Sequence, residues 1–229
     1  MQPMVDSWNY GPENPSRIFL VGNGASLKKT NLDLLIGKPS MAVNKIHMIY
    51  DKTDWRPTHY FKVDYSNFDD WKSEILQHVN NGEQCLLWDA FRAGADKNDG
   101  NYEYIYDGIG DFDNVKYIPR CDHHYLRTAM WHPFCTGLNS IVTMVMWAGA
   151  LGFEEIVLVG CDGKFSNPKE DHFVENYYHS VDAEYEDRNN TNIYYAHKMI
   201  SENCPIPIYD ATVDGYLDFY PKVRLEDYA

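Results

Sequence analysis

The chain has few basic residues, no paired cysteines and no long apolar run, and each shortage excludes a class of protein. Lys and Arg number 20 against 34 Asp and Glu, so the formal net charge is −14. A protein that binds nucleic acid over its surface is normally basic, because phosphate neutralisation supplies much of the affinity. We therefore expect no nucleic-acid partner, although a local group of donors can still bind a single nucleotide.

The five cysteines include no CxxC pair, and their odd number and wide spacing argue against a disulfide framework or a structural zinc site. Reduced thiols predict a cytoplasmic protein. The longest weakly polar run, at 140–151, is shorter than the roughly 20 apolar residues that a membrane span needs. We expect no transmembrane segment, and the polar stretch at 1–15 predicts no secretory signal.

Short apolar runs alternate with segments of helical spacing along most of the chain. Buried strands are expected at 17–22, 40–44, 58–63, 84–88, 115–118, 155–160 and 206–209. Helices are expected at 31–36, 70–80, 136–152 and 191–203, the last with Asn190 or Thr191 as its N-cap. This alternation predicts an α/β fold, a Rossmann-like three-layer sandwich with a mostly parallel sheet.

The domain organisation follows from the composition. Residues 1–16 are rich in Pro, Asn and Gly and predict a loose lead-in, and residues 17–229 predict one Rossmann-like domain. Two polar segments with little periodicity, 89–113 and 161–190, are interpreted as excursions that could form lids. Ligands of such sheets bind outside the carboxyl ends of the strands, so the candidate site residues are sought there.

A glycine-containing turn, Gly22-Asn23-Gly24-Ala25-Ser26, follows the first expected strand directly. Glycine lets the backbone approach a ligand closely, and exposed N–H groups before a helix start suit an anion such as a phosphate. Asn23 and Ser26 add side-chain donors. The alternative is a plain strand-to-helix turn, because the pattern is neither GxGxxG nor a Walker A loop.

Two further polar residues stand at the ends of expected strands. Asn44 closes the second strand, where its amide could bind a base or a ribose, although a turn residue that bonds nearby backbone is the alternative. Asp162 follows the strand at 155–160. It could bind a sugar hydroxyl, accept a proton or hold a metal, and the alternative is an aspartate that satisfies its own turn.

A polar segment near residue 175 combines two histidines with two tyrosines. His172 and His179 titrate near neutral pH and are candidates for the general base that deprotonates a hydroxyl. Tyr177 and Tyr178 could hydrogen-bond a leaving phosphate. We expect one of the two histidines to point into the pocket near Asn23, with His172 slightly favoured.

This pattern resembles the bacterial family 42 sialyltransferases over nearly the whole chain, from residue 17 to 227. The turn at 22–27, the strand that ends in Asn44, Thr136-Gly137 before a long helix and the segment 150–162 are similar to that family's motifs in order and spacing. The resemblance implies a nucleotide-dependent transferase fold. It implies nucleotide contacts from Asn23 and Asn44. We expect the rest of the nucleotide site to be formed by Gly22, Gly24, Ser26, Thr136 and Gly137.

The resemblance also implies a catalytic base, and the chain departs from the family pattern at Phe165. His179, which is followed by Ser180, looks like the family's base. Phe165 stands where the sialyltransferases have a tyrosine that bonds the donor phosphate. Tyr177 or Tyr178 could take over that contact.

The same frame looks like the 6-hydroxymethylpterin diphosphokinase-like (MptE-like) family. That resemblance is carried by Gly160-Cys-Asp162, by His172-Phe173 followed by Tyr177, and by the closing segment 209–221. It implies an enzyme that moves pyrophosphate from ATP with Mg²⁺, for which Asp162 is the expected ligand.

The sequence therefore supports a leading hypothesis and two alternatives. The leading one is a glycosyltransferase that takes a nucleotide-sugar donor, CMP-linked in preference, and acts on a glycan or glycolipid hydroxyl without a cofactor. The alternatives are the Mg²⁺-dependent diphosphokinase and a non-catalytic nucleotide- or glycan-binding protein. His123-His124 lacks the spacing of helical metal ligands, so no resident metal site is expected. A homo-oligomer and peripheral attachment at the inner membrane face are further expectations.

Overall fold

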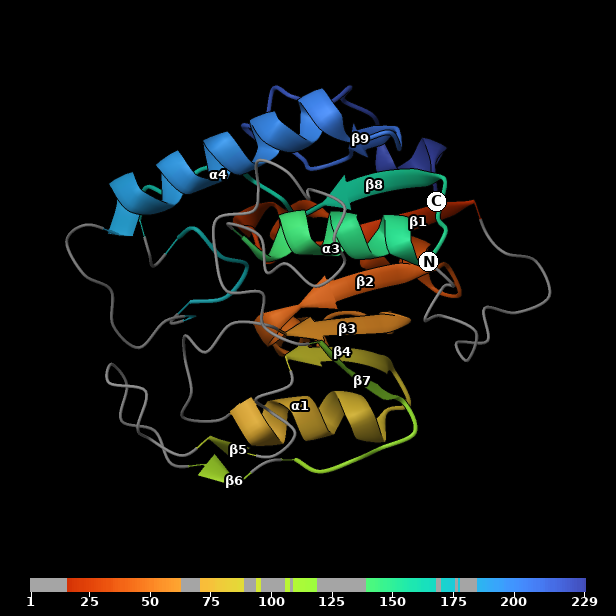
Figure 1. Cartoon of the computed structure of the whole chain (residues 1–229). Coiled ribbons are helices and arrows are strands. Elements are labelled where there is room, and N and C mark those ends of the chain that lie inside the picture. Colours follow the sequence, from red (N-terminus) through yellow and green to blue (C-terminus); the bar gives the residue numbers. More distant parts are fainter. Residues whose placement is uncertain are drawn as a thin grey trace.

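A seven-stranded sheet forms the centre of the computed structural model (Figure 1). Its strands are β1 (Arg17–Val21), β2 (Ser40–Val43), β3 (His59–Lys62), β4 (Gln84–Trp88), β7 (Val115–Ile118), β8 (Glu155–Val159) and β9 (Ile208–Asp210). They lie in the order β7-β4-β3-β2-β1-β8-β9, and each neighbouring pair is parallel. The structure describes residues 16–62, 71–88, 94–95, 106–107, 109–118, 139–167, 170–175, 177 and 185–229.

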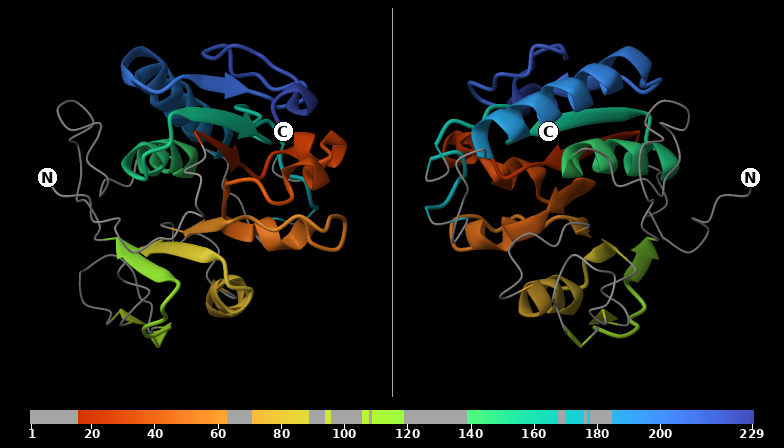
Figure 2. Two further views of the ribbon diagram at one scale, coloured as in Figure 1. Left: turned by 90° about the vertical axis from the view of Figure 1, so that its right-hand side faces the viewer. Right: turned by 60° about the vertical axis from the view of Figure 1, so that its left-hand side comes forward.

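Helices cover both faces of this sheet, which confirms the predicted three-layer α/β architecture (Figures 1 and 2). The α-helices are α1 (Trp71–Asn80), α3 (Ser140–Ala150) and α4 (Tyr185–Asn203). Short 3-10 helices follow the first two strands: η1 (Ala25–Lys29), η2 (Leu32–Leu35) and η3 (Asn44–Ile49), and η6 (Leu225–Asp227) lies near the C-terminus. The helix expected at 31–36 is thus a single 3-10 turn.

Alternation along β1 divides the core into two halves. Ile18 and Leu20 pack on the side of α3 and α4, whereas Phe19 and Val21 pack on the side of α1 and the 3-10 helices. All four side chains are buried. A strand buried on both faces reads as a continuous apolar run, which is why the run at 17–22 predicted this strand correctly.

The sheet has its topological switch point at β1. The chain adds β2, β3, β4 and β7 on one side of β1 and then returns to add β8 and β9 on the other. In open parallel sheets the crevice at such a switch point lies beyond the carboxyl ends of the strands, and it is the usual ligand site. The segments that follow β1 and β8 therefore meet at the place where a ligand is expected.

The last helix begins earlier than predicted. The expected helix at 191–203 with an Asn190 or Thr191 cap is in fact α4, which starts at Tyr185, so Asn190 lies inside it. The Asn190 amide is used elsewhere: Oδ1 accepts from the Phe165 N–H and Nδ2 donates to the Phe165 carbonyl, each at 2.7 Å. A side chain satisfied by a distant loop does not cap its own helix, and this pairing is invisible in a local pattern.

Part of each proposed lid is described. Within 89–113, the two-residue strands β5 (Gly94–Ala95) and β6 (Tyr106–Asp107) pair antiparallel. The roles of 89–113 and 161–190 as lids stay predictions. Within the described ranges, no helix has both the length and the apolar character that crossing a membrane requires.

Candidate functional site

The turn after β1 is bound closely to the end of β8 and to the loop that follows it. The Gly22 N–H donates to the Val159 carbonyl at 2.8 Å, and the Gly24 N–H donates to the Gly160 carbonyl at 2.9 Å. A Cβ at Gly22 would lie 2.5 Å from the Gly160 oxygen, and a Cβ at Gly24 would lie 2.4 Å from Cγ of Asp162. The glycines are thus required by the close approach of two protein segments.

The Asp162 carboxylate is hydrogen-bonded to the same turn through Ser26. Its Oδ2 accepts from the Ser26 N–H at 3.0 Å, and its Oδ1 accepts a short hydrogen bond from the Ser26 hydroxyl. Burial raises the pKa of Asp162, and the hydrogen bonds from Ser26 oppose that rise. The N–H groups of Gly22, Gly24 and Ser26 are all hydrogen-bonded within the protein, and these bonds fix the turn. A ligand would therefore contact the side chains of the turn and not these three N–H groups.

The segment after β9 supports Asp162 from behind. The Thr212 hydroxyl accepts from the Cys161 N–H at 3.0 Å, and the Tyr216 N–H donates to the Asp162 carbonyl at 2.8 Å. The Thr212 N–H in turn donates to Oδ1 of Asp210 at 2.8 Å. The closing motif at 209–221 therefore acts by positioning the loop that carries Asp162.

Asn23 and Asn44 lie side by side where β1 and β2 end. Nδ2 of Asn23 donates to the Val43 carbonyl at 2.9 Å, next to Asn44, whose φ of 53° turns the chain sharply. Oδ1 of each asparagine is buried and has no hydrogen-bond partner among the described residues. Leaving a buried acceptor without a donor costs about 1–3 kcal/mol of stability. These two oxygens therefore need a hydrogen-bond donor that the described residues do not supply.

His172 is tied to the glycine turn. Its Nδ1 lies 3.0 Å from the Asn23 carbonyl oxygen, and a β-bridge pairs its backbone with that of Gly24. The ring stacks on Tyr177 with centroids 3.9 Å apart. Burial lowers the pKa of His172, so the imidazole is neutral at pH 7.

Sequence reasoning missed one cation beside this group. Lys45 follows Asn44 directly, and its Nζ donates to the Tyr177 carbonyl at 3.2 Å while lying 5.8 Å from the centre of the Tyr177 ring. Its position immediately after a candidate strand-end asparagine was the signal that could have found it. Lys45 therefore places a positive charge beside Tyr177, the residue whose ring stacks on His172.

Tyr178, His179, Thr136 and Gly137 are not among the residues that the structure describes, and their roles stay predictions. His197 is buried at a different place, with Nδ1 2.8 Å from the Tyr220 hydroxyl. In the described part of the chain, no three His, Cys, Asp or Glu side chains are grouped to hold a metal ion.

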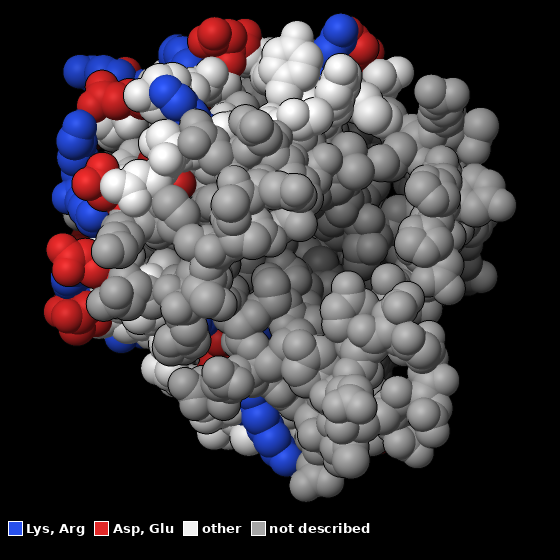
Figure 3. Space-filling view, turned by 90° about the vertical axis from the view of Figure 1, so that its left-hand side faces the viewer, with Lys and Arg blue, Asp and Glu red and all other residues white. Residues whose placement is uncertain are grey.

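Figure 3 views the edge at which the strands end. Described Lys, Arg, Asp and Glu side chains gather along one border of this face, with both signs interspersed. Lys45 is a described cation that could meet an anionic ligand at this edge.

Comparisons with known proteins bear on the fold. No model of a known protein family matches the sequence, and no curated protein sequence matches it. Among solved structures, the sialyltransferase CstII from Campylobacter jejuni, in complex with a trisaccharide acceptor and CMP, is 14% identical with a TM-score of 0.51. That match covers 90% of this chain and 85% of CstII.

Two further structures show the same likeness. The monofunctional alpha-2,3-sialyltransferase Cst-I from Campylobacter jejuni is 14% identical with a TM-score of 0.51, over 93% of this chain and 82% of Cst-I. The MAf glycosyltransferase from Magnetospirillum magneticum AMB-1 is 13% identical with a TM-score of 0.50, over 91% of this chain but only 33% of that protein. At such identities the likeness shows the fold alone, which this chain shares with the two sialyltransferases and the MAf glycosyltransferase.

Proposed function

We propose that the protein is a nucleotide-sugar-dependent glycosyltransferase of the sialyltransferase kind, which takes a CMP-linked donor and glycosylates a hydroxyl of a glycan or glycolipid. The observation that carries the proposal is the pair of buried amide oxygens on Asn23 and Asn44. Both atoms are acceptors, so the ligand must present donors. Ribose hydroxyls and the exocyclic amine of cytosine are such donors, and uracil has no such amine. The complex of the similarly folded CstII with CMP agrees with this choice.

The transfer step follows from the state of His172. A carbonyl oxygen only accepts, so Nδ1 carries the ring proton that is donated to Asn23, and Nε2 carries the lone pair. Nε2 would take the proton of the acceptor hydroxyl while that oxygen bonds to the anomeric carbon and the bond from this carbon to the phosphate oxygen breaks, releasing CMP. Nε2 is buried, so acceptor binding must expose it.

Two groups assist this step in the proposal. The Tyr177 ring stacks on His172 and fixes the plane of the imidazole. Lys45, held at the Tyr177 carbonyl, offers a positive charge to the phosphate as CMP leaves. Direct bonding of the phosphate by Tyr177 or Tyr178 stays a prediction, as does the alternative assignment of the base to His179.

A nucleotide panel tests the proposal. Thermal unfolding and calorimetry are measured with CMP, CDP, UDP, GDP and ATP at concentrations up to the millimolar range. We expect CMP and CDP to raise the midpoint of unfolding, and UDP to do so less, because uracil cannot donate from position 4. The absence of any stabilisation by any of the five nucleotides would overturn the proposal.

The alternatives receive no specific support from the described residues. A diphosphokinase would use Asp162 as a Mg²⁺ ligand, yet both oxygens of that carboxylate accept hydrogen bonds from Ser26. Activity in EDTA separates the two enzymes, since a reaction that depends on Mg²⁺ is lost there. A non-catalytic protein would bind CMP without transfer over long incubation. Homo-oligomer formation and attachment at the inner membrane face stay predictions.

A further inference from the structure

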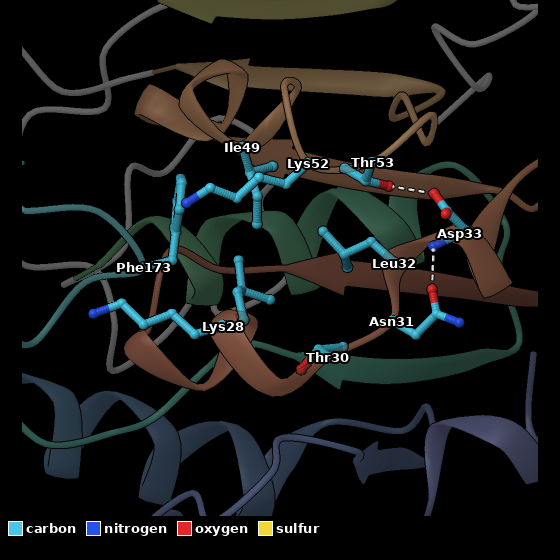
Figure 4. A pocket seen from close by; sticks show the side chains of 10 residues that line it. Lys28, Thr30, Asn31, Leu32, Asp33, Ile49, Lys52, Thr53 and Phe173 are labelled. Atoms are coloured by element: carbon cyan, nitrogen blue, oxygen red, sulfur yellow. Dashed lines mark hydrogen bonds between the residues drawn. The ribbon is translucent and has the colours of Figure 1, made fainter.

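A pocket of about 150 Å³ lies beside the site, between the 3-10 helices that follow β1 and β2 (Figure 4). Phe173, the residue after His172, forms part of its wall, and Leu32 and Ile49 give it an apolar lining. A water molecule occupies roughly 30 Å³ in the liquid, so the pocket has room for about five waters, the scale of one sugar ring. The transfer chemistry does not use this pocket.

The two ends of the pocket differ in charge. Lys28 and Lys52 extend toward one end, on either side of Phe173, whereas Asn31, Asp33 and Thr53 lie at the other end (Figure 4). Salt bridges within the described residues include neither lysine, although the chain as a whole carries a net charge of −14. The cationic end is therefore a local feature, open to an anion.

The opposite end is acidic, and its carboxylate is hydrogen-bonded within the protein. Asp33 accepts from the Thr53 hydroxyl at 2.5 Å and from the Asp54 N–H at 3.0 Å, and the hydroxyl bond lowers the pKa of Asp33. An ionised carboxylate repels a second anionic group but accepts hydrogen bonds from hydroxyls. The pocket thus selects a ligand with one anionic end and one hydroxylated end. A polyphosphate, which is anionic along its whole length, does not fit this description.

We infer that this pocket binds an anionic sugar residue of the acceptor, with its carboxylate or phosphate at Lys28 and Lys52 and its hydroxyls at Asp33. The inference rests on the proposed function, because it supplies the acceptor of the transferase. A sugar in this pocket would pack against Phe173, the residue that directly follows the proposed base His172. The two lysines select the anionic group of the sugar, and Asp33 selects its uncharged hydroxyls.

The test measures binding of simple probes by calorimetry to the wild type and to two matched double variants. The probes are glucuronic acid, glucose 6-phosphate, glucose and inorganic phosphate. The pocket variant is Lys28→Gln with Lys52→Gln. The control is Lys38→Gln with Lys198→Gln, which makes the same charge change at exposed positions outside the pocket.

We expect glucuronic acid or glucose 6-phosphate to bind about tenfold more tightly than glucose, since each exposed lysine contributes up to about fivefold. The pocket variant loses this preference and its dependence on salt, and the control keeps both. Which of the two acids binds identifies the anion. Equal binding of glucose, binding of neither acid, or inorganic phosphate binding as tightly as the sugars overturns the inference.

A titration with CMP keeps this outcome separate from the proposed function. The pocket variant should bind CMP as the wild type does, because Lys28 and Lys52 line the pocket, and neither Asn23 nor Asn44 does. Failure of the acidic sugars with CMP binding intact removes the anionic acceptor alone. Failure of the wild type to bind CMP removes the transferase proposal.

Discussion

His172 donates a hydrogen bond from Nδ1 to the backbone carbonyl oxygen of Asn23, at 3.0 Å. Asn23 also presents the buried Oδ1 that the proposed nucleotide would satisfy. One residue therefore positions both the proposed base and the proposed donor substrate. The bond selects the tautomer with the lone pair on Nε2, the atom from which proton transfer can proceed.

Replacing His172 should separate transfer from nucleotide binding. In His172→Gln the proton acceptor is lost, and we expect the transfer rate to fall by about 10²–10⁴-fold. The affinity for CMP should change little, because the base acts on the acceptor. His197→Gln is the matched control, since it replaces a buried histidine outside the site. A His172→Gln variant with wild-type transfer would contradict the assignment.

The pH dependence of transfer should report the lowered pKa of His172. Burial keeps the ring neutral below its ordinary pKa of 6.5, so the base remains active as the pH falls through 6.5. We expect kcat/KM to decline only at a pH below 6.5, as the ring is finally protonated. A decline centred at or above 6.5 would instead indicate a solvated histidine, and His179 would then be the candidate.

The Ser26–Asp162 contact should contribute to stability as well as to the shape of the site. Ser26→Ala removes the hydroxyl that donates to the half-buried Asp162 carboxylate, so we expect a loss of about 1–3 kcal/mol in the free energy of unfolding. Ser166→Ala is the control, because its hydroxyl bonds the exposed face of Asp171 at 3.3 Å. Urea unfolding measures both, and equal losses would argue against a special role for Ser26.

A buried ion pair beneath α1 makes a further prediction. Lys62 at the end of β3 lies 3.4 Å from Glu74, and their side chains are 2% and 3% exposed. Lys62→Met leaves the carboxylate buried without its cation and should cost about 3–5 kcal/mol of unfolding free energy. Adding Glu74→Gln removes that charge and keeps an acceptor for the Tyr60 hydroxyl.

The double variant should therefore regain most of the stability that the single variant loses. Urea unfolding of both variants and of Glu74→Gln completes the cycle. A double variant that is as unstable as Lys62→Met alone would show that the lost packing of the lysine stem, rather than the unpaired charge, causes the effect.

The fold was predictable because its signals are local. The bounds of β4 and β7 agree with the expected 84–88 and 115–118, since both segments are short and rich in apolar or aromatic residues, and β7 lies between Asn114 and Pro119. Alternating strands and helices require a layered sheet, and the structure adds that every neighbouring strand pair is parallel. The start of α4 was missed because Asn190 is satisfied by Phe165, which is 25 residues away.

The site was predictable in its location and less so in its contacts. Strand ends placed Asn23, Asn44 and Asp162 at one edge of the sheet. Whether the N–H groups of the glycine turn face a ligand or a neighbouring loop depends on tertiary pairing, and here they bond the segment after β8. Lys45 and the pocket lysines carry no motif, because a lysine becomes a site residue only through what folds beside it.

Calorimetric titration of CMP tests most directly whether Asn23 and Asn44 form a nucleotide site. The wild type, Asn23→Ala, Asn44→Ala and the control Asn203→Ala, at the exposed end of α4, are compared at one salt concentration. The account predicts saturable CMP binding by the wild type and the control, and binding at least about fivefold weaker in each site variant, since each loses a buried hydrogen bond. No CMP binding by the wild type, or undiminished binding by both site variants, would contradict it.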